Sequence, residues 1–139
     1  MLRRILYTSR ASEGISMRDA YDIIRVSHNR NSRVGITGGL IFLDGHFVQL
    51  MEGLPAAVET RYERIAADGR HHELAIRQDE LVETPTFADE WMALRDGSRI
   101  DPALLDRFGY RPGLPQDEFD GEQVFDLLRA CFDNELAAA

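Results

Sequence analysis

Three polar side chains, those of Tyr7, Asn31 and Gln49, stand in or beside segments made mostly of apolar and β-branched residues. A phenol and two carboxamides form directional hydrogen bonds, and a buried amide needs partners from the protein or from a ligand. Taken singly, a strand tyrosine is usually a packing residue, and an asparagine near a helix end is usually a cap. A functional interpretation therefore depends on whether the fold brings the three together.

Gln49 belongs to a predicted β-hairpin over 35–53, because Asp44-Gly45 separates two runs of β-favouring residues and suits a two-residue type I′ turn. In that register Leu40 pairs with Gln49, and Gly38, close by, leaves space where a bulky residue could have been. Both faces of the hairpin are mainly apolar, so both should be covered. The face opposite Gln49 carries Ile41, Val48, Leu50 and Glu52.

The remaining segments predict an α+β, ferredoxin-like sheet of order β-α-β-β-α-β-β, with two helices on one face and Tyr7 in a strand beside that of Gln49. The first helix should open at a capping box of Ser16 and Asp19 and stop near His28 or Asn29, with 30–34 as a link that places Asn31 just past the helix. The second should run from Pro55 to about Asp68, where Arg64 can meet Asp68 across one turn. Further strands are expected over 4–9, 74–83 and 87–94.

The C-terminal part supplies a cover for the second face of the sheet. Residues 102–108 predict a short helix, and a wide apolar stripe over 124–132 predicts a longer one. We expect this last helix to pack on Ile41, Val48 and Leu50, within the chain or across a homodimer. The chain then divides into a domain over 1–95 and a helical extension over 96–139.

Composition narrows the class of protein. The 139 residues carry a net charge of −8, which disfavours a nucleic-acid surface. The sequence holds one cysteine, Cys131, which fits a reducing compartment, and no long apolar run that would enter a membrane. These features predict a soluble cytoplasmic protein. The pair His71-His72 has no cysteine or acidic partner at ligand spacing, so no metal site is expected.

Several separated motifs, in the right order over roughly residues 1–95, resemble the BLUF family of flavin-based blue-light sensors. They are Ile5-Leu-Tyr7-Thr-Ser9, Asn31 before Gly35-Ile-Thr-Gly38, Asp44-Gly45, Phe47-Val-Gln49-Leu-Met-Glu-Gly53 and Arg64-Ile-Ala-Ala-Asp68-Gly-Arg-His-His72. The extra C-terminal helices resemble those of short BLUF proteins, which have no output enzyme.

The resemblance implies a non-covalent flavin, commonly FAD, with FMN or riboflavin as alternatives. Its ring would lie between Ile23 and Ile65, and Gln49 would bridge Tyr7 to it. Asn31 would bond the pyrimidine edge of the ring, with Arg64 and Asp68 as further polar contacts. Arg70 and His71 would help to order the flavin end of the second helix. In the family's mechanism a phenol gives an electron and then a proton to excited flavin, and the amide relays that proton. The implied photocycle ends with oxidised flavin in an altered hydrogen-bond network and a slightly red-shifted spectrum.

Three positions depart from the family pattern. Arg30 stands where a second polar flavin contact is common, and it is retained here as a candidate contact. Glu90 occupies the usual tryptophan position and Trp91 follows it, while Met92 keeps the register of the family's methionine. Because successive strand residues face opposite ways, we expect Met92, and not Trp91, near the flavin. Gly39 replaces a frequent leucine, with consequences for packing only.

The leading hypothesis is therefore a photoreceptor without catalytic activity that passes its signal to an unidentified downstream protein. A flavin-dependent small-molecule enzyme is a second interpretation, although no dinucleotide-binding glycine pattern supports it. An interaction module without a chromophore is a third. The colour of the purified protein, its response to blue light and its turnover of NADH distinguish the three.

Overall fold

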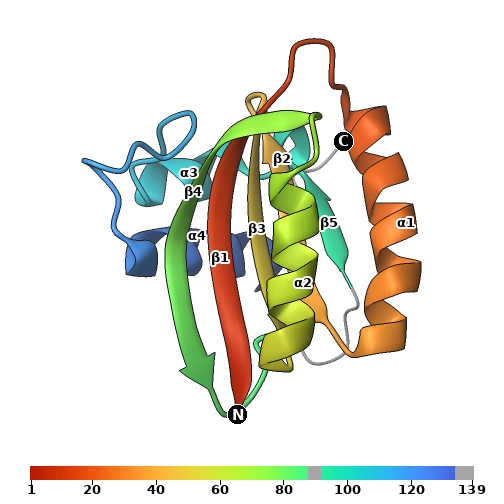
Figure 1. The fold of residues 1–139 in the computed structure, drawn as a ribbon. Coiled ribbons are helices and arrows are strands. Elements are labelled where there is room, and N and C mark those ends of the chain that lie inside the picture. The colour runs from red at the N-terminus through yellow and green to blue at the C-terminus, as the bar shows by residue number, and fades with distance from the viewer. Residues whose placement is uncertain (88–91, 134–139) are drawn as a thin grey trace.

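The computed structural model describes residues 1–87 and 92–133, and across these ranges one mixed sheet separates two layers of helices (Figure 1). The strands are β1 (Leu2–Ala11), β2 (Thr37–Leu43), β3 (His46–Gly53), β4 (His71–Val82) and β5 (Ala93–Asp96). They lie in the order β4-β1-β3-β2-β5, with β2 and β5 parallel and the other neighbours antiparallel. The predicted ferredoxin-like order, with the first and third strands adjacent, is confirmed.

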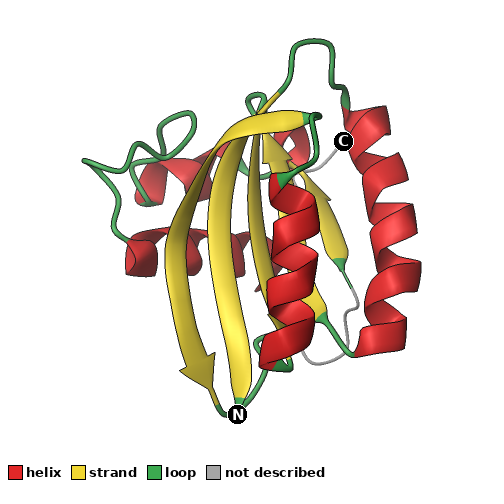
Figure 2. Cartoon of the chain, in the orientation of Figure 1, coloured by secondary structure: helices red, strands yellow, loops and turns green. Residues whose placement is uncertain are grey.

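Helices cover both faces of this sheet (Figure 2). One face carries α1 (Met17–Val34) and α2 (Pro55–Ala66), which the predicted capping box of Ser16 and Asp19 and the proline at the first position of α2 help to start. The other face carries η1 (Gly97–Arg99), α3 (Pro102–Arg107) and α4 (Gly121–Asp133). In Figure 1, α4 crosses behind the strands, on the side away from α2.

The hairpin of β2 and β3 has the predicted turn and register. Asp44 and Gly45 both have positive φ, 51° and 73°, and Leu40 pairs with Gln49. The reason given for Gly38 is wrong, however. A Cβ at Gly38 would stand 1.9 Å from the carbonyl oxygen of Leu50, so the glycine permits a close backbone approach and does not open space before Gln49.

The alternation of side chains in these strands divides the described apolar residues between two cores. The core under α1 and α2 includes Ile5, Tyr7, Leu40, Phe47 and Met51. The core under the C-terminal helices joins Leu6, Ile41, Val48 and Leu50 of the sheet to Leu104, Val124, Leu127, Leu128 and Cys131. The prediction that the last helix covers this face is confirmed, and the cover comes from the same chain.

The first helix is longer than predicted. It continues through the expected link to Val34 and ends at Gly35, whose φ of 71° gives a left-handed C-cap. Residues 30–34 contain no glycine or proline, so nothing in the backbone stops the helix earlier. The placement of Asn31 just past the helix is therefore wrong. Asn31 lies in the helix near its C-terminal end, with 1% of its surface exposed.

Two further predictions about local structure need correction. The second helix ends at Ala66, so Asp68 lies outside it and pairs with Arg70 and not with Arg64. The last strand begins at Ala93. Phe87 does not start it, because the backbone amides of Thr86 and Phe87 donate to the carboxylate of Glu52, at 2.6 and 3.4 Å, and not to a neighbouring strand. The expectations for Glu90 and Trp91 lie outside the described residues.

Candidate functional site

A line of three buried side chains begins in the central strands on the α1/α2 side of the sheet. Tyr7 of β1 stands directly opposite Gln49 of β3, and its hydroxyl donates to Gln49 Oε1. Gln49 Nε2 donates to Met92 Sδ at 3.4 Å, just before β5 begins. The three residues are 2%, 6% and 3% exposed. Both ends of one amide are thus held by partners of opposite character, a donor and a weak acceptor.

A pocket with an empty volume of about 420 Å³, part of it open to solvent, lies against this line. Its apolar walls come from Ile23 of α1, Ile65 of α2, and Leu40 and Phe47 of the hairpin. Its polar lining is Tyr7, Ser27, Gln49, Asp68, Arg70 and His71. An apolar slot with a few convergent polar groups is the usual form of a site for a small organic ligand.

His71 fixes the end of the pocket where α2 passes into β4. Its Nε2 donates to the carbonyl of Ile65 at 2.7 Å, and in the neutral ring Nδ1 then accepts from the Ser9 hydroxyl at 2.7 Å. The ring also stands edge-on to Tyr7 and to Phe47, with centroid separations of 6.2 and 6.1 Å. The ring contact restricts the orientation of Tyr7, and the hydrogen bond to the carbonyl of Ile65 ties the end of α2 to His71.

The charge states in the site follow from burial and pairing. Burial raises the pKa of the Tyr7 phenol, and Tyr62 and Asp68 raise it further, so the proton stays on the hydroxyl. Hydrogen bonds from Arg70 are the main reason that the pKa of Asp68 is lowered. The pocket therefore presents a neutral phenol and amide beside one paired carboxylate.

The pocket gathers part of the predicted set of site residues. Tyr7, Ile23, Gln49, Ile65, Asp68 and His71 line it, and Met92 contacts Gln49. Arg30, Asn31 and Arg64 are not among its lining residues. Arg30 is exposed on α1, Asn31 is buried in α1, and Arg64 lines a second pocket near the start of α2.

Four lining residues are additions to the predicted set: Ser27, Leu40, Phe47 and Arg70. Ser27 lies one helical turn after Ile23, and Leu40 and Phe47 share the face of Gln49, so helical and hairpin periodicity could have identified them. Arg70 belonged to the family motif, but with His71 it was expected only to help order the flavin end of the second helix. Arg70 lines the pocket because α2 ends at Ala66, which leaves Asp68 free to form an ion pair with the Arg70 guanidinium.

The fold and the pocket define a ferredoxin-like α+β ligand-binding protein in which a buried phenol and carboxamide share the wall of a site between two helices. The chain belongs to the BLUF family, whose model, described as sensors of blue-light using FAD, matches residues 2–93. BLUF domains bind a flavin and act as sensor modules.

Relatives and solved structures agree with this assignment. The chain is 33% identical over 90 residues to the photoactivated adenylate cyclase subunit beta of Euglena gracilis, covering 65% of this chain and 10% of that protein. It is 30% identical over 96 residues to the blue light- and temperature-regulated antirepressor BluF of Escherichia coli K12, covering 69% of this chain and 24% of BluF. The chain thus spans about a tenth of the cyclase subunit's length.

Two solved structures match nearly the whole fold. The dark-state structure of the BLUF protein BlrB has a TM-score of 0.75 and 30% identity, covering 93% of this chain and 96% of BlrB. The photo-activated state of BlsA has a TM-score of 0.83 over 100% of both chains, and at 21% identity that likeness concerns the fold. The C-terminal helices are therefore included in both structural matches.

Within 1–87 and 92–133, no group of three or more His, Cys, Asp or Glu side chains is placed to hold a metal ion. No helix in the same ranges is long and apolar enough to cross a membrane.

Proposed function

We propose that this chain is a blue-light receptor whose flavin occupies the pocket between α1 and α2. The observation that carries the proposal is the hydrogen-bonded line from Tyr7 through Gln49 to Met92. Two of these residues, Tyr7 and Gln49, line the pocket. This line connects the strands β1 and β3 to Met92, the residue just before β5. A change in hydrogen bonding at the pocket would therefore reach the sheet directly.

The pocket suits a flat, largely apolar ring with a polar edge. Ile23 and Ile65 come from the two helices and would contact opposite faces of such a ring, while Leu40 and Phe47 provide further apolar contacts. Gln49, Asp68 and Arg70 offer the hydrogen-bond donors and acceptors that a heterocycle needs.

A bound flavin supplies absorption of blue light and, when excited, an acceptor for an electron. The protein supplies the path for a proton. Tyr7 holds its proton at the hydroxyl, directly on the hydrogen bond to Gln49 Oε1, and can pass it along that bond and recover it. Gln49 can exchange partners because its amide both donates and accepts, and Met92 is only a weak competitor for its Nε2. The resulting state differs in hydrogen bonding and consumes nothing.

The finer assignments belong to the same proposal. FAD is the flavin named by the family description, with FMN and riboflavin as alternatives, and Arg30, Asn31 and Arg64 extend the polar contacts along α1 and α2. Residues 1–95 form the sensor and 96–139 the extension that a downstream protein reads. We further propose a cytoplasmic location, on the single Cys131. A homodimer no longer follows from the apolar sheet face, because α4 covers that face.

Absorption spectroscopy under blue light tests the proposal. The purified protein should be yellow, and illumination should shift its spectrum slightly and reversibly to the red. Tyr7→Phe and Gln49→Leu should each abolish the shift while flavin stays bound, because each removes one end of the same hydrogen bond. Tyr21→Phe is the matched control, since Tyr21 is 59% exposed on α1 and should leave the shift unchanged.

Three outcomes would contradict the assignment. A normal photocycle in Tyr7→Phe or Gln49→Leu would remove these residues from the mechanism. Steady oxidation of NADH would favour a flavin enzyme. A colourless protein that cannot be reconstituted with flavin would favour an interaction module.

A further inference from the structure

Two arginines of α2 line a second pocket, outside the one described above, and Arg30 of α1 lies near enough for its charge to act on Arg61. Arg61 and Arg64 come from α2, and Arg30 comes from α1. The pKa of Arg61 is lowered, first by burial and then by the positive charges of Arg30 and Arg64. Among the described residues, no carboxylate forms an ion pair with any of the three. Within the described part of the chain, these positive charges thus lie near one another without a carboxylate partner.

The second pocket opens beside these arginines. Its lining consists of Thr60, Arg61 and Arg64, together with Val34 and the small residues Ala56 and Ala57. Its empty volume is about 670 Å³, much of it open to solvent. The Nε of Arg61 is buried and has no hydrogen-bond partner within the described part of the chain. A buried donor without an acceptor is costly, and an anion in this pocket would remove that cost.

We propose that this pocket is a binding site for a phosphoryl group, held by Arg61 and Arg64, with Thr60 as a further polar contact and the charge of Arg30 in support. Several guanidinium groups and a hydroxyl provide donors for more oxygens than a carboxylate has, and arginine suits phosphate geometry. The volume has room for a diphosphate or for a phosphate carried on a larger molecule.

Two sources offer this chemistry. One is the phosphorylated tail of a flavin whose ring lies in the first pocket, and this version rests on the proposed function. Both pockets are lined from α2, by Ile65 in the first and by Arg64 in the second. The other source is a separate phosphorylated small molecule. In the first case the site selects FMN and FAD over riboflavin, and in the second it adds a ligand to the sensor.

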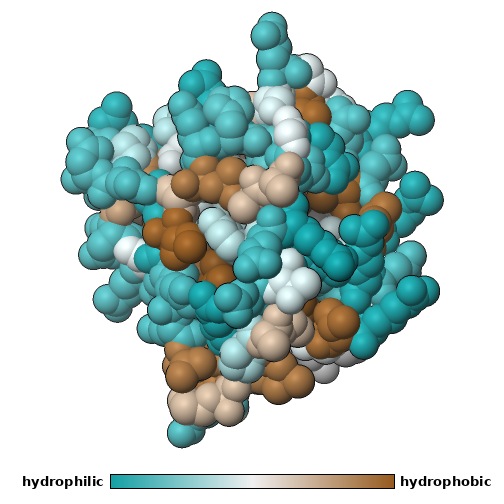
Figure 3. All heavy atoms as spheres, in the orientation of Figure 1, coloured by the Kyte–Doolittle hydropathy of each residue, from teal (hydrophilic) through white to brown (hydrophobic). Residues whose placement is uncertain are grey.

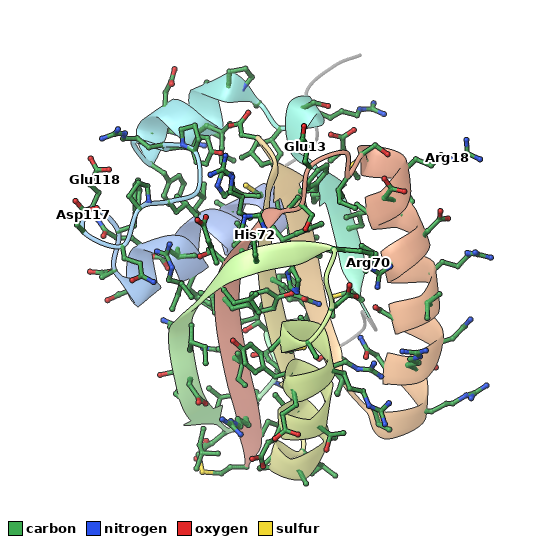
Figure 4. All side chains as sticks on the ribbon, turned by 45° about the horizontal axis from the view of Figure 1, so that its top comes forward. Glu13, Arg18, Arg70, His72, Asp117 and Glu118 are labelled. Atoms are coloured by element: carbon green, nitrogen blue, oxygen red, sulfur yellow. The ribbon has the colours of Figure 1, made fainter. Side chains whose placement is uncertain are left out.

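Calorimetry with inorganic pyrophosphate tests the site on the full chain, both free of flavin and loaded with riboflavin. We expect binding that Arg61→Gln weakens about tenfold or more, because it removes a charge-assisted contact. Arg18→Gln is the matched control, since Arg18 projects from the outer side of α1, away from α2 (Figure 4). Arg18→Gln should leave pyrophosphate affinity unchanged. Absence of pyrophosphate binding, or equal losses in both variants, would overturn the proposal.

Titration of the flavin-free protein with riboflavin, FMN and FAD separates the two sources. If the tail is the ligand, FMN and FAD bind about tenfold tighter than riboflavin, Arg61→Gln removes only that preference, and pyrophosphate competes with FAD. If a separate molecule is the ligand, the three flavins bind alike and pyrophosphate still binds the loaded protein. Failure of all three flavins, with Arg61-dependent pyrophosphate binding intact, would reject the photoreceptor proposal alone.

Discussion

In the proposed mechanism, the behaviour of the site depends on the side-chain amide of Gln49. Its oxygen accepts from Tyr7 and its nitrogen donates to Met92 Sδ, so the described network favours one orientation of the amide. Turned by 180°, the amide would set its oxygen against the thioether sulfur, and two acceptors would face each other. Because that sulfur is a weak acceptor, the preference is small. A modest change at Tyr7 can therefore change the partners of Gln49.

The protonation of Tyr7 gives a prediction at the same scale. Burial raises the pKa of Tyr7, so above about pH 10 the unfolded chain loses this proton while the folded chain keeps it. The stabilising effect of the neutral phenol is complete below about pH 10 and declines above it. Alkaline titration followed by tyrosinate absorbance should therefore show Tyr7 among the tyrosines that ionise only on unfolding.

Two tyrosine variants test whether Tyr7 is among the tyrosines that ionise only on unfolding. Tyr7→Phe should remove one equivalent from the late-ionising tyrosines, and Tyr21→Phe should remove one that ionises freely. If Tyr7→Phe instead reduces the free fraction, the phenol is accessible to solvent in the folded protein. That result would contradict the burial of the Tyr7–Gln49 pair.

At the scale of elements, Glu52 links β3 to the segment that precedes Met92. Its buried carboxylate accepts from Arg4 Nε at 2.9 Å, from the backbone amide of Thr86 at 2.6 Å and from the Thr86 hydroxyl at 2.9 Å. Glu52 lies only three residues after Gln49 in the same strand. β3 therefore contacts the segment between β4 and β5 at two points: Glu52 binds Thr86, and Gln49 binds Met92.

Glu52→Gln should lower the free energy of unfolding by about 2–3 kcal/mol, because it leaves Arg4 partly buried without its main counter-ion and turns an amide NH₂ toward donors. Glu80→Gln is the control. Glu80 binds the same arginine at 3.1 Å, but its side chain is half exposed, so its loss should cost less than about 1 kcal/mol. Urea unfolding measures both, and equal losses would show that Glu52 has no special role.

At the scale of the whole molecule, the sheet divides two cores with different tasks. The core under α1 and α2 contains Tyr7 and Leu40 of the pocket wall, while the opposite core attaches α4 through Val124, Leu127 and Leu128. On the face shown in Figure 3, exposed apolar side chains form separate patches within a largely hydrophilic surface. Aromatic contacts join the β5 region to α4, since Phe132 packs against Phe87 and beneath the guanidinium of Arg95.

This division predicts that stability and photochemistry can be separated. Leu128→Ala should destabilise the protein by about 2–5 kcal/mol, because Leu128 is fully buried between α4 and the sheet. The red shift should persist, since Tyr7 and Gln49 lie on the other face. Asp126→Ala, on the exposed side of α4, should change stability by less than about 0.5 kcal/mol. Loss of the photocycle in a folded Leu128→Ala protein would contradict this separation.

Local sequence patterns determined much of this protein. Asp44-Gly45 specified the turn and, with it, the register that places Gln49 opposite Leu40, because a two-residue turn fixes every pair that follows. The same alternation sorted Ile41, Val48 and Leu50 onto the face that α4 covers. Tyr7 and Gln49 were expected in neighbouring strands, and the motifs around them identified the family.

Tertiary structure decided what local pattern leaves open. Helix ends depend on caps, so α1 runs to Gly35 and takes Asn31 into the helix, and α2 stops at Ala66 and frees Asp68 to pair with Arg70. Thr86 and Phe87 stay outside β5 because their backbone amides donate to Glu52, a carboxylate distant in the sequence. The end of α1 and the pairing of Asp68 with Arg70 are local outcomes of capping and hydrogen bonding, which periodicity does not describe. The bonds to Glu52 join residues more than 30 positions apart, and a local pattern carries no information about such contacts.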